Sequence, residues 1–126
     1  MSCLTFDAIR CMARGEKWRV DIDWGENTSG SETGALKAGD TVASATVAVH
    51  SKNPSTADDP TLSSVTVNGS AIYVNGRSCS AGEATTFTVT AASDQAYGEY
   101  VLKVTATTTA TYVFVRFIKF VVQPPG

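Results

Sequence analysis

The last quarter of the chain constrains the fold most, because it holds two long runs of strand-forming residues, YVLKVTA and TYVFVRFIKFVV, separated only by residues 107–110. In the second run both alternate sets of side chains are mainly apolar. A strand with one solvated face alternates apolar and polar residues, so this strand is predicted to be covered on both faces, by its own domain or by another chain. We assign Phe114 and Ile118 to the core. The opposite set, Val115, Phe117 and Lys119, is predicted to meet a neighbour.

The first clean strand is predicted over residues 17–24, KWRVDIDW, where apolar and charged residues alternate strictly. The period of two indicates a strand with one buried and one solvated face. Each indole of this strand removes roughly 150 to 250 Å² from water when it is buried, so the strand is expected to organise the core. The core residues predicted here are Trp18, Val20, Ile22 and Trp24.

Turn-forming residues divide the rest of the chain into short strands. Residues 25–40, 52–60 and 91–98 are rich in Gly, Ser, Asp or Pro and are predicted to be exposed loops. Two Asn-Gly pairs, at 68–69 and 75–76, predict tight hairpin turns. About seven strands with frequent turns and no convincing helix predict an all-β fold, an immunoglobulin-like β-sandwich, with a small barrel as the alternative. Besides residues 17–24, the strands are expected at 41–50, 62–69, 71–76, 85–90, 100–106 and 112–122.

The N-terminal segment does not follow the sandwich pattern. We therefore divide the chain into an N-terminal arm, residues 1–15, and a β-sandwich domain, residues 16–126. The segment has three interpretations: a short helix, an extended arm against a neighbouring subunit, or a disordered tail. Its predicted anchors are Leu4, Phe6, Ile9 and Met12, and its removal is expected to leave a folded domain.

Charge and hydropathy restrict the class of partner. The chain has 126 residues, with ten Lys plus Arg against twelve Asp plus Glu, and its basic residues are scattered. A nucleic-acid partner needs a concentrated positive stripe, so it is not expected. No apolar stretch approaches the length of a membrane span, and the first residues lack the pattern of a secretory signal. We expect synthesis in a cytoplasm and no membrane partner.

The residues that carry chemistry are sparse. His50 is the single histidine and has no orienting partner in the sequence pattern, so we expect no catalytic residue and no enzyme activity. Asp21 with Asp23, and Asp58 with Asp59, lack the regular spacing of a calcium motif, and we interpret them as solvated carboxylates. Cys3, Cys11 and Cys79 lack paired zinc-ligand spacing. They are expected as free thiols, with a Cys3 to Cys11 bridge as the alternative. No metal and no cofactor is predicted.

Three short motifs resemble a known family. They are Asp23-Trp24 at the end of the first strand, Gly39-Asp40-Thr41 with the small residues that follow to Ser44, and the closing Tyr-rich and Thr-rich hairpin. Over about residues 17–122 the chain resembles the fibre-tail adaptor proteins of tailed bacteriophages. Where that family commonly has a Gly-containing turn in the last hairpin, this chain has Thr108, Thr109, Ala110 and Thr111.

The resemblance implies a structural virion protein that joins a fibre or another appendage to the tail or neck. Its implied partners are other virion proteins and further copies in a homo-oligomer or ring, and its implied location is the virion, after synthesis in the bacterial host cytoplasm. A capsid decoration or cement protein is one alternative. A carbohydrate-binding or adhesin module with exposed Tyr73, Tyr97 and Tyr100 is another.

Overall fold

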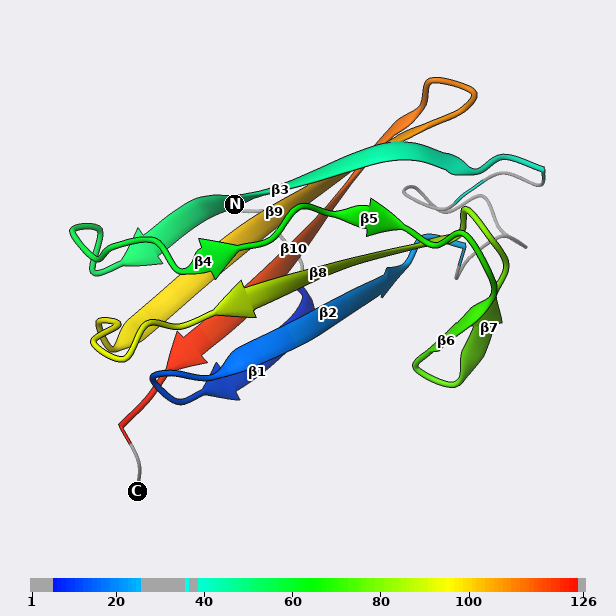
Figure 1. Ribbon diagram of the computed structural model, residues 1–126. Coiled ribbons are helices and arrows are strands. Elements are labelled where there is room, and N and C mark those ends of the chain that lie inside the picture. Colours follow the sequence, from blue (N-terminus) through cyan, green and yellow to red (C-terminus); the bar gives the residue numbers. More distant parts are fainter. Residues whose placement is uncertain (1–5, 26–35, 37–38, 125–126) are drawn as a thin grey trace.

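The computed structural model describes residues 6–25, 36 and 39–124, which form ten strands and no helix (Figure 1). This confirms the all-β prediction and the sandwich architecture. No helix capable of crossing a membrane occurs in these residues. The strands are β1 (Phe6–Met12), β2 (Lys17–Asp23), β3 (Val42–Asn53), β4 (Thr61–Leu62), β5 (Thr66–Val67), β6 (Ile72–Val74), β7 (Arg77–Cys79), β8 (Ala84–Thr90), β9 (Gly98–Thr108) and β10 (Val113–Val122).

Two sheets pack face to face, and a small hairpin extends from one end (Figure 1). The first sheet has the order β1-β10-β9-β3, and the second has the order β2-β8-β4, with β5 also paired to β8. β6 and β7 form the hairpin. All pairs are antiparallel except β1 with β10, which run parallel. The closing hairpin predicted from the sequence is the β9–β10 pair at the centre of the first sheet.

The expected N-terminal arm is part of the sandwich, so the domain boundary after residue 15 is wrong. Residues 6–12 complete the open edge of β10, and Met12 is buried in the core. The backbone then passes through a turn in which the Gly15 amide donates to the carbonyl of Ala91 at 3.0 Å, and it enters the second sheet as β2. Removal of this segment would expose the edge of β10 and take Met12 out of the core, whereas the sequence predicted a domain that folds without it. Leu4 lies outside the described residues, and of Phe6 only the backbone is described.

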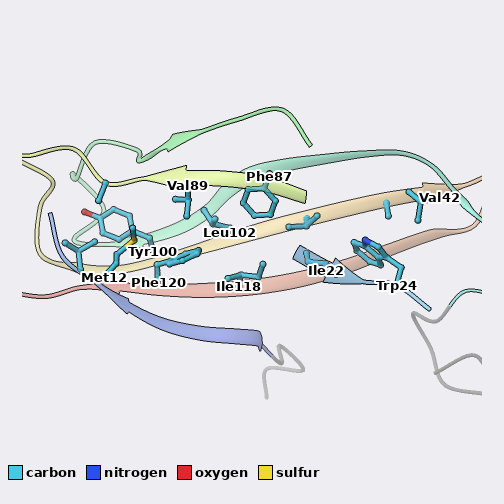
Figure 2. Packing of buried hydrophobic residues seen from close by; sticks show 14 of the residues in the cluster. Met12, Ile22, Trp24, Val42, Phe87, Val89, Tyr100, Leu102, Ile118 and Phe120 are labelled. Atoms are coloured by element: carbon cyan, nitrogen blue, oxygen red, sulfur yellow. The ribbon is translucent and has the colours of Figure 1, made fainter. Parts of the chain in front are cut away.

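The core lies between the sheets and runs the length of the sandwich (Figure 2). Ile22, Trp24 and Ile118 are buried in it, as expected of them. Trp18, Val20 and Phe114 pack against the same cluster but keep part of their surface in water, because they lie nearer the edges.

Trp24 sits at one end of the core beside Val42 (Figure 2). Its indole N–H donates to the hydroxyl of the buried Thr85 at 2.8 Å, which satisfies the one polar group that burial of an indole requires. The guanidinium of Arg116 lies 5.4 Å from the centre of the Trp24 ring. The predicted exposed loop over residues 25–40 is wrong at Leu36, which is buried and whose amide donates to the carbonyl of Trp24 at 3.0 Å.

One Asn-Gly pair forms the predicted turn and the other does not. Asn75 and Gly76 have φ of 52° and 84° and connect β6 to β7, as a tight hairpin turn requires. The side chain of Asn68 instead connects neighbouring segments of the backbone by hydrogen bonds. Its amide donates to the carbonyls of Cys79 and Ser80, and its Oδ1 accepts from the amides of two residues that precede or begin β8, Gly82 and Ala84.

Gly98, the first residue of β9, should not tolerate a side chain. Its φ is 145°, and a Cβ there would lie 2.0 Å from the carbonyl oxygen of Asn53 on the neighbouring strand. We predict that Gly98→Ala lowers the free energy of unfolding by about 3 kcal/mol or more, since both the backbone angle and the overlap must be relieved. Urea denaturation of the wild type and the variant measures this difference in the free energy of unfolding.

The matched control is Gly69→Ala, because a Cβ at Gly69 has no atom within 4 Å. We expect a change of about 0.5 kcal/mol or less for this variant. Equal stability losses in the two variants would contradict the steric argument.

Candidate functional site

The outward surface of the first sheet carries three exposed large apolar side chains, and we call it the outer face. Ile9, Val113 and Val115 are 64%, 59% and 38% exposed. Phe117, Val121 and Val101 are partly exposed on the same side. These residues alternate along β1, β9 and β10 with side chains that point into the core, so a single sheet presents apolar groups on both sides.

Strand register brings these residues into neighbouring rows. Across β10, Val115 pairs with Thr105, Phe117 with Lys103, and Lys119 with both Val101 and Ile9. Residues in register on adjacent strands project from the same face, so the apolar side chains of β1, β9 and β10 share the outer face with Lys119, Lys103 and Thr105. The predicted separation of Val115 and Phe117 from Phe114 and Ile118 is present. Coverage of the outer face by a neighbour stays a prediction.

The outer face also carries charged side chains, among them Lys119 and the exposed Lys103. Lys119 forms an ion pair with Glu99. The ring of His50 meets that of Phe117 edge-on, with 5.1 Å between centroids. His50 lies in an irregular stretch of β3 and is exposed. The contact that the structure describes for His50 is therefore aromatic packing.

The predicted carboxylate pairs are used within the fold. Asp21 accepts from the hydroxyl of Thr86 at 2.6 Å and pairs with Arg19, and Asp59 pairs with Lys52 at 2.8 Å. Asp23 is not solvated as expected: it is buried against Arg77, 2.6 Å from the guanidinium. Among the described residues no group of three His, Cys, Asp or Glu side chains could hold a metal ion.

Arg77 is the centre of a polar cluster that sequence reasoning missed. Its guanidinium reaches Asp23 and Glu83, and it lies 3.5 Å from the sulfur of Cys79. The hydrogen bond to Asp23 raises the pKa of Arg77 further above its ordinary value. Burial is the main cause of the raised pKa of the Cys79 thiol, which stays protonated and unreactive. Cys79 and the exposed Cys11 both carry free thiols, and Cys3 lies outside the described residues.

Asp40 is a second residue whose role the sequence did not indicate. Its carboxylate accepts from the amides of Thr41 at 2.9 Å and Ala110 at 3.1 Å. The carbonyl of Thr41 in turn accepts from the amide of Thr109 at 2.8 Å. Gly39, with φ of 82°, lets the chain enter this arrangement. The Gly-Asp-Thr motif therefore holds the turn between β9 and β10 from the side, and we call this contact the turn clamp.

A groove lies between the open edges of the two sheets. It has a volume of about 360 Å³ and is lined by β3 and the segment that joins β4 to β5, with Ala45, Val47, Leu62 and Val65 as its apolar side chains. Its remaining lining residues are Thr and Ser. The groove therefore lacks the titratable groups that a catalytic site needs.

The tyrosines of the carbohydrate hypothesis do not gather. Tyr73 is in β6 at one end of the sandwich, whereas Tyr97 directly precedes β9 at the other end, where the guanidinium of Arg14 lies 3.8 Å from the centre of its ring (Figure 1). Tyr100 is buried, and its hydroxyl donates to the carbonyl of Ala96 at 2.5 Å. A sugar platform that uses the three residues together is not formed.

Comparisons with known proteins bear on the fold alone. No family model matches the chain, and no curated protein does. Among solved structures, the chain is similar to a family 123 glycoside hydrolase from Clostridium perfringens that was studied for glycolipid glycan hydrolysis, with a TM-score of 0.56 and 10% sequence identity. The match covers 97% of this chain and 24% of that one, so the chain spans about a quarter of that protein's length. At this identity the likeness supports a shared β architecture.

The turn clamp should make the free energy of unfolding depend on pH in the acidic range. The Thr108 hydroxyl, followed by the amides of Ala110 and Thr41, lowers the pKa of Asp40 below its ordinary value. A carboxyl group whose pKa is lower in the folded state stabilises the fold above its unfolded pKa of about 4, and this contribution is lost as pH falls through the folded value. We predict that the difference in melting temperature between wild type and Asp40→Asn is present at pH 6 and shrinks below pH 4. A difference that stays constant down to pH 2.5 would contradict it.

The same turn contains a strained residue. Thr111 has φ of 71°, a region that a β-branched side chain adopts at a cost of roughly 1 to 3 kcal/mol. We predict that Thr111→Gly raises the free energy of unfolding by about 0.5 to 1 kcal/mol after the greater chain entropy of glycine is subtracted. Thr109→Gly is the control and should destabilise, because it removes the contact between the Thr109 and Thr41 hydroxyls. The urea midpoints of both variants distinguish the two explanations. Relief of strain raises the midpoint for Thr111→Gly, whereas loss of a side chain lowers it in both variants.

Proposed function

We propose that the protein is a structural component of a tailed bacteriophage particle, an adaptor that joins fibres or another appendage to the tail or neck through subunit contacts. In this proposal the protein is not an enzyme and holds no cofactor. It is synthesised in the cytoplasm of the bacterial host and acts in the assembled virion. Its partners are other virion proteins and further copies of itself. The observation that carries the proposal is the outer face, where Ile9, Val113 and Val115 are exposed on a sandwich that already has a buried core of its own.

The three motifs of the resemblance lie together in space, which supports treating them as one unit. Trp24 donates its amide to the carbonyl of Glu83, and Val42, directly after the Gly-Asp-Thr motif, donates to the adjacent carbonyl of Gly82. The turn clamp joins Thr41 to the last hairpin, and Arg116 of that hairpin covers Trp24. Short motifs that contact one another at one end of a fold are better evidence of shared architecture than the same motifs read separately.

Strand order supports the immunoglobulin-like assignment within this proposal. The order β1-β10-β9-β3 facing β2-β8-β4 corresponds to the two sheets of such a sandwich, with β1 as an added edge strand. Tyr100 lies near the start of β9, and its hydroxyl bonds four residues upstream to Ala96. This is the geometry of a tyrosine corner, a feature typical of immunoglobulin-like domains.

A joining role fits the outer face better than ligand binding does. Monomeric proteins seldom expose large continuous apolar surfaces, and such surfaces mark sites of protein contact. A capsid cement protein would use the same surface, so it remains the second candidate and differs in location. The carbohydrate alternative has less support because its aromatic residues lie at opposite ends of the sandwich.

The proposal predicts a location that electron microscopy can test. Gold-labelled antibody against this chain should mark the neck or tail of intact particles from the source lysate. Label spread over the shell would instead indicate a cement protein. Intact particles without label would contradict any virion role.

Incorporation should depend on the outer face. Val115→Lys replaces one of the exposed apolar side chains of β10 by a charge, and we predict that it reduces the amount of the chain in purified particles by about tenfold, given the cost of burying an unpaired charge at an interface. The matched control is Thr88→Lys, on the outward side of the second sheet, which should be incorporated normally. Equal incorporation of both variants would contradict a role for the outer face.

A further inference from the structure

We infer that the open edge of the sandwich beside β3 is a strand-addition site, which binds an extended, uncharged and mainly aliphatic segment of another polypeptide. The added strand pairs with β3 and places alternate side chains in the groove between β3 and the segment that joins β4 to β5. The inference deepens the proposed function, and it rests on that function only for assigning the bound segment to another virion protein. Three observations carry it: the backbone of β3, the distribution of charge along the edges, and the groove.

The backbone of β3 is paired on one side only within the part of the chain that the structure describes. β9 lies along its inner side, and the first sheet ends with β3 (Figure 1). Over residues 44–49 the pairing with β9 is regular, and register shifts occur at either end of this stretch. The regular stretch therefore presents an uninterrupted row of unpaired amide and carbonyl groups, and the ligand that satisfies such a row is an extended polypeptide.

Charge distinguishes this edge of the sandwich from the opposite one. Residues 42–49 of β3 and residues 61–67, which include β4 and β5, contain no charged residue and no proline. The opposite edge, formed by β1 and β2, carries the exposed side chains of Arg10, Lys17 and Arg19. Charges and prolines on an edge strand hinder its pairing with other chains. The sandwich is therefore protected against strand addition along one edge and open to it along the other.

The groove provides space for the side chains of the added strand. Ala45 and Val47 line one wall, and Leu62 and Val65 line the other. All four pack against the core but are only partly buried, so the core is open to solvent along this edge. A strand paired with residues 44–49 turns alternate side chains to one face, so about three of them enter the groove. Its volume of about 360 Å³ suits aliphatic side chains, whose burial extends the core.

A charge in the groove should block the added strand. Ser64 is exposed and lines the groove, so Ser64→Lys introduces a charge without removing a core contact. We expect this variant to be reduced about tenfold in purified particles, because the bound segment would bury the ammonium without a partner. Ser78→Lys is the matched control, since Ser78 is exposed on β7 outside the groove, and it should be incorporated normally. Ala45→Lys is a second groove variant, and circular dichroism establishes that each variant is folded.

Hydrogen–deuterium exchange followed by mass spectrometry tests the pairing itself. In purified particles, amides of residues 43–50 on the free edge of β3 should exchange about tenfold more slowly than in the free chain at the same pH and temperature. Peptides from β8 are the internal control, because β8 is already paired with β2 on one side and with β4 and β5 on the other. Their exchange should not change.

A synthetic peptide tests the site without particles. The probe is KKTVTVTVKK, in which the terminal lysines provide solubility and the valines lie on one face of the extended strand. In an NMR titration of the full chain, we expect saturable shifts of amide signals from residues 43–50 and 61–67. The peptide KKTDTDTDKK, which carries aspartate in place of valine, should cause none.

The outcomes separate this inference from the adaptor proposal. Particles that contain the chain but leave residues 43–50 unprotected, or that incorporate both groove variants normally, overturn strand addition and leave the adaptor proposal standing. A dimer of the purified chain that Ser64→Lys dissociates makes a second copy the occupant and also overturns it. If particles lack the chain, the adaptor proposal fails and the peptide decides: binding of KKTVTVTVKK supports strand addition by a partner outside the virion, and no binding overturns it.

Discussion

The structure depends on β10 being paired along both of its edges. β9 pairs with it over its whole length in antiparallel register, and β1 pairs in parallel with its other edge from Phe117 to Val122. These ladders satisfy the backbone groups of a strand whose inward side chains, Ile118, Phe120 and Val122, are buried in the core. With its backbone fixed in this way, β10 can present apolar side chains outward without opening its own edge to other chains.

Much of the fold could be predicted because it follows from local pattern. The alternation in residues 17–24 identifies β2 and its inward residues, and the long apolar run identifies β10. The Asn75-Gly76 turn was predictable for the same reason, since two residues with positive φ are a local requirement. Each of these features depends on residues close together in the sequence, where side-chain period and turn chemistry act directly.

The features that the sequence did not reveal depend on distant partners. Residues 6–12 have no strict alternation, and they form a strand because β10 offers a free edge more than a hundred residues later. Asp23 sits on the outward side of β2, yet Arg77 on a separate hairpin covers it. Leu36 and Asp40 lie in a polar stretch whose composition predicts a loop. Leu36 contacts Trp24 at the end of β2, and Asp40 contacts the turn between β9 and β10. The outer face was predictable as a surface, but its neighbour was not, because apolar character alone does not identify what covers it.

The parallel pairing of β1 with β10 has a consequence for the order of assembly of the chain. Residues 6–12 leave the ribosome before their pairing partners, residues 117–122, have been synthesised. Contacts so far apart in sequence form late, since the chain between them must be ordered first. β1 therefore stays unpaired until β10 has formed, and its pairing with β10 follows the formation of the rest of the first sheet. The outer face is therefore complete only after residues 117–122 have been synthesised, because Ile9 joins that face in the same step.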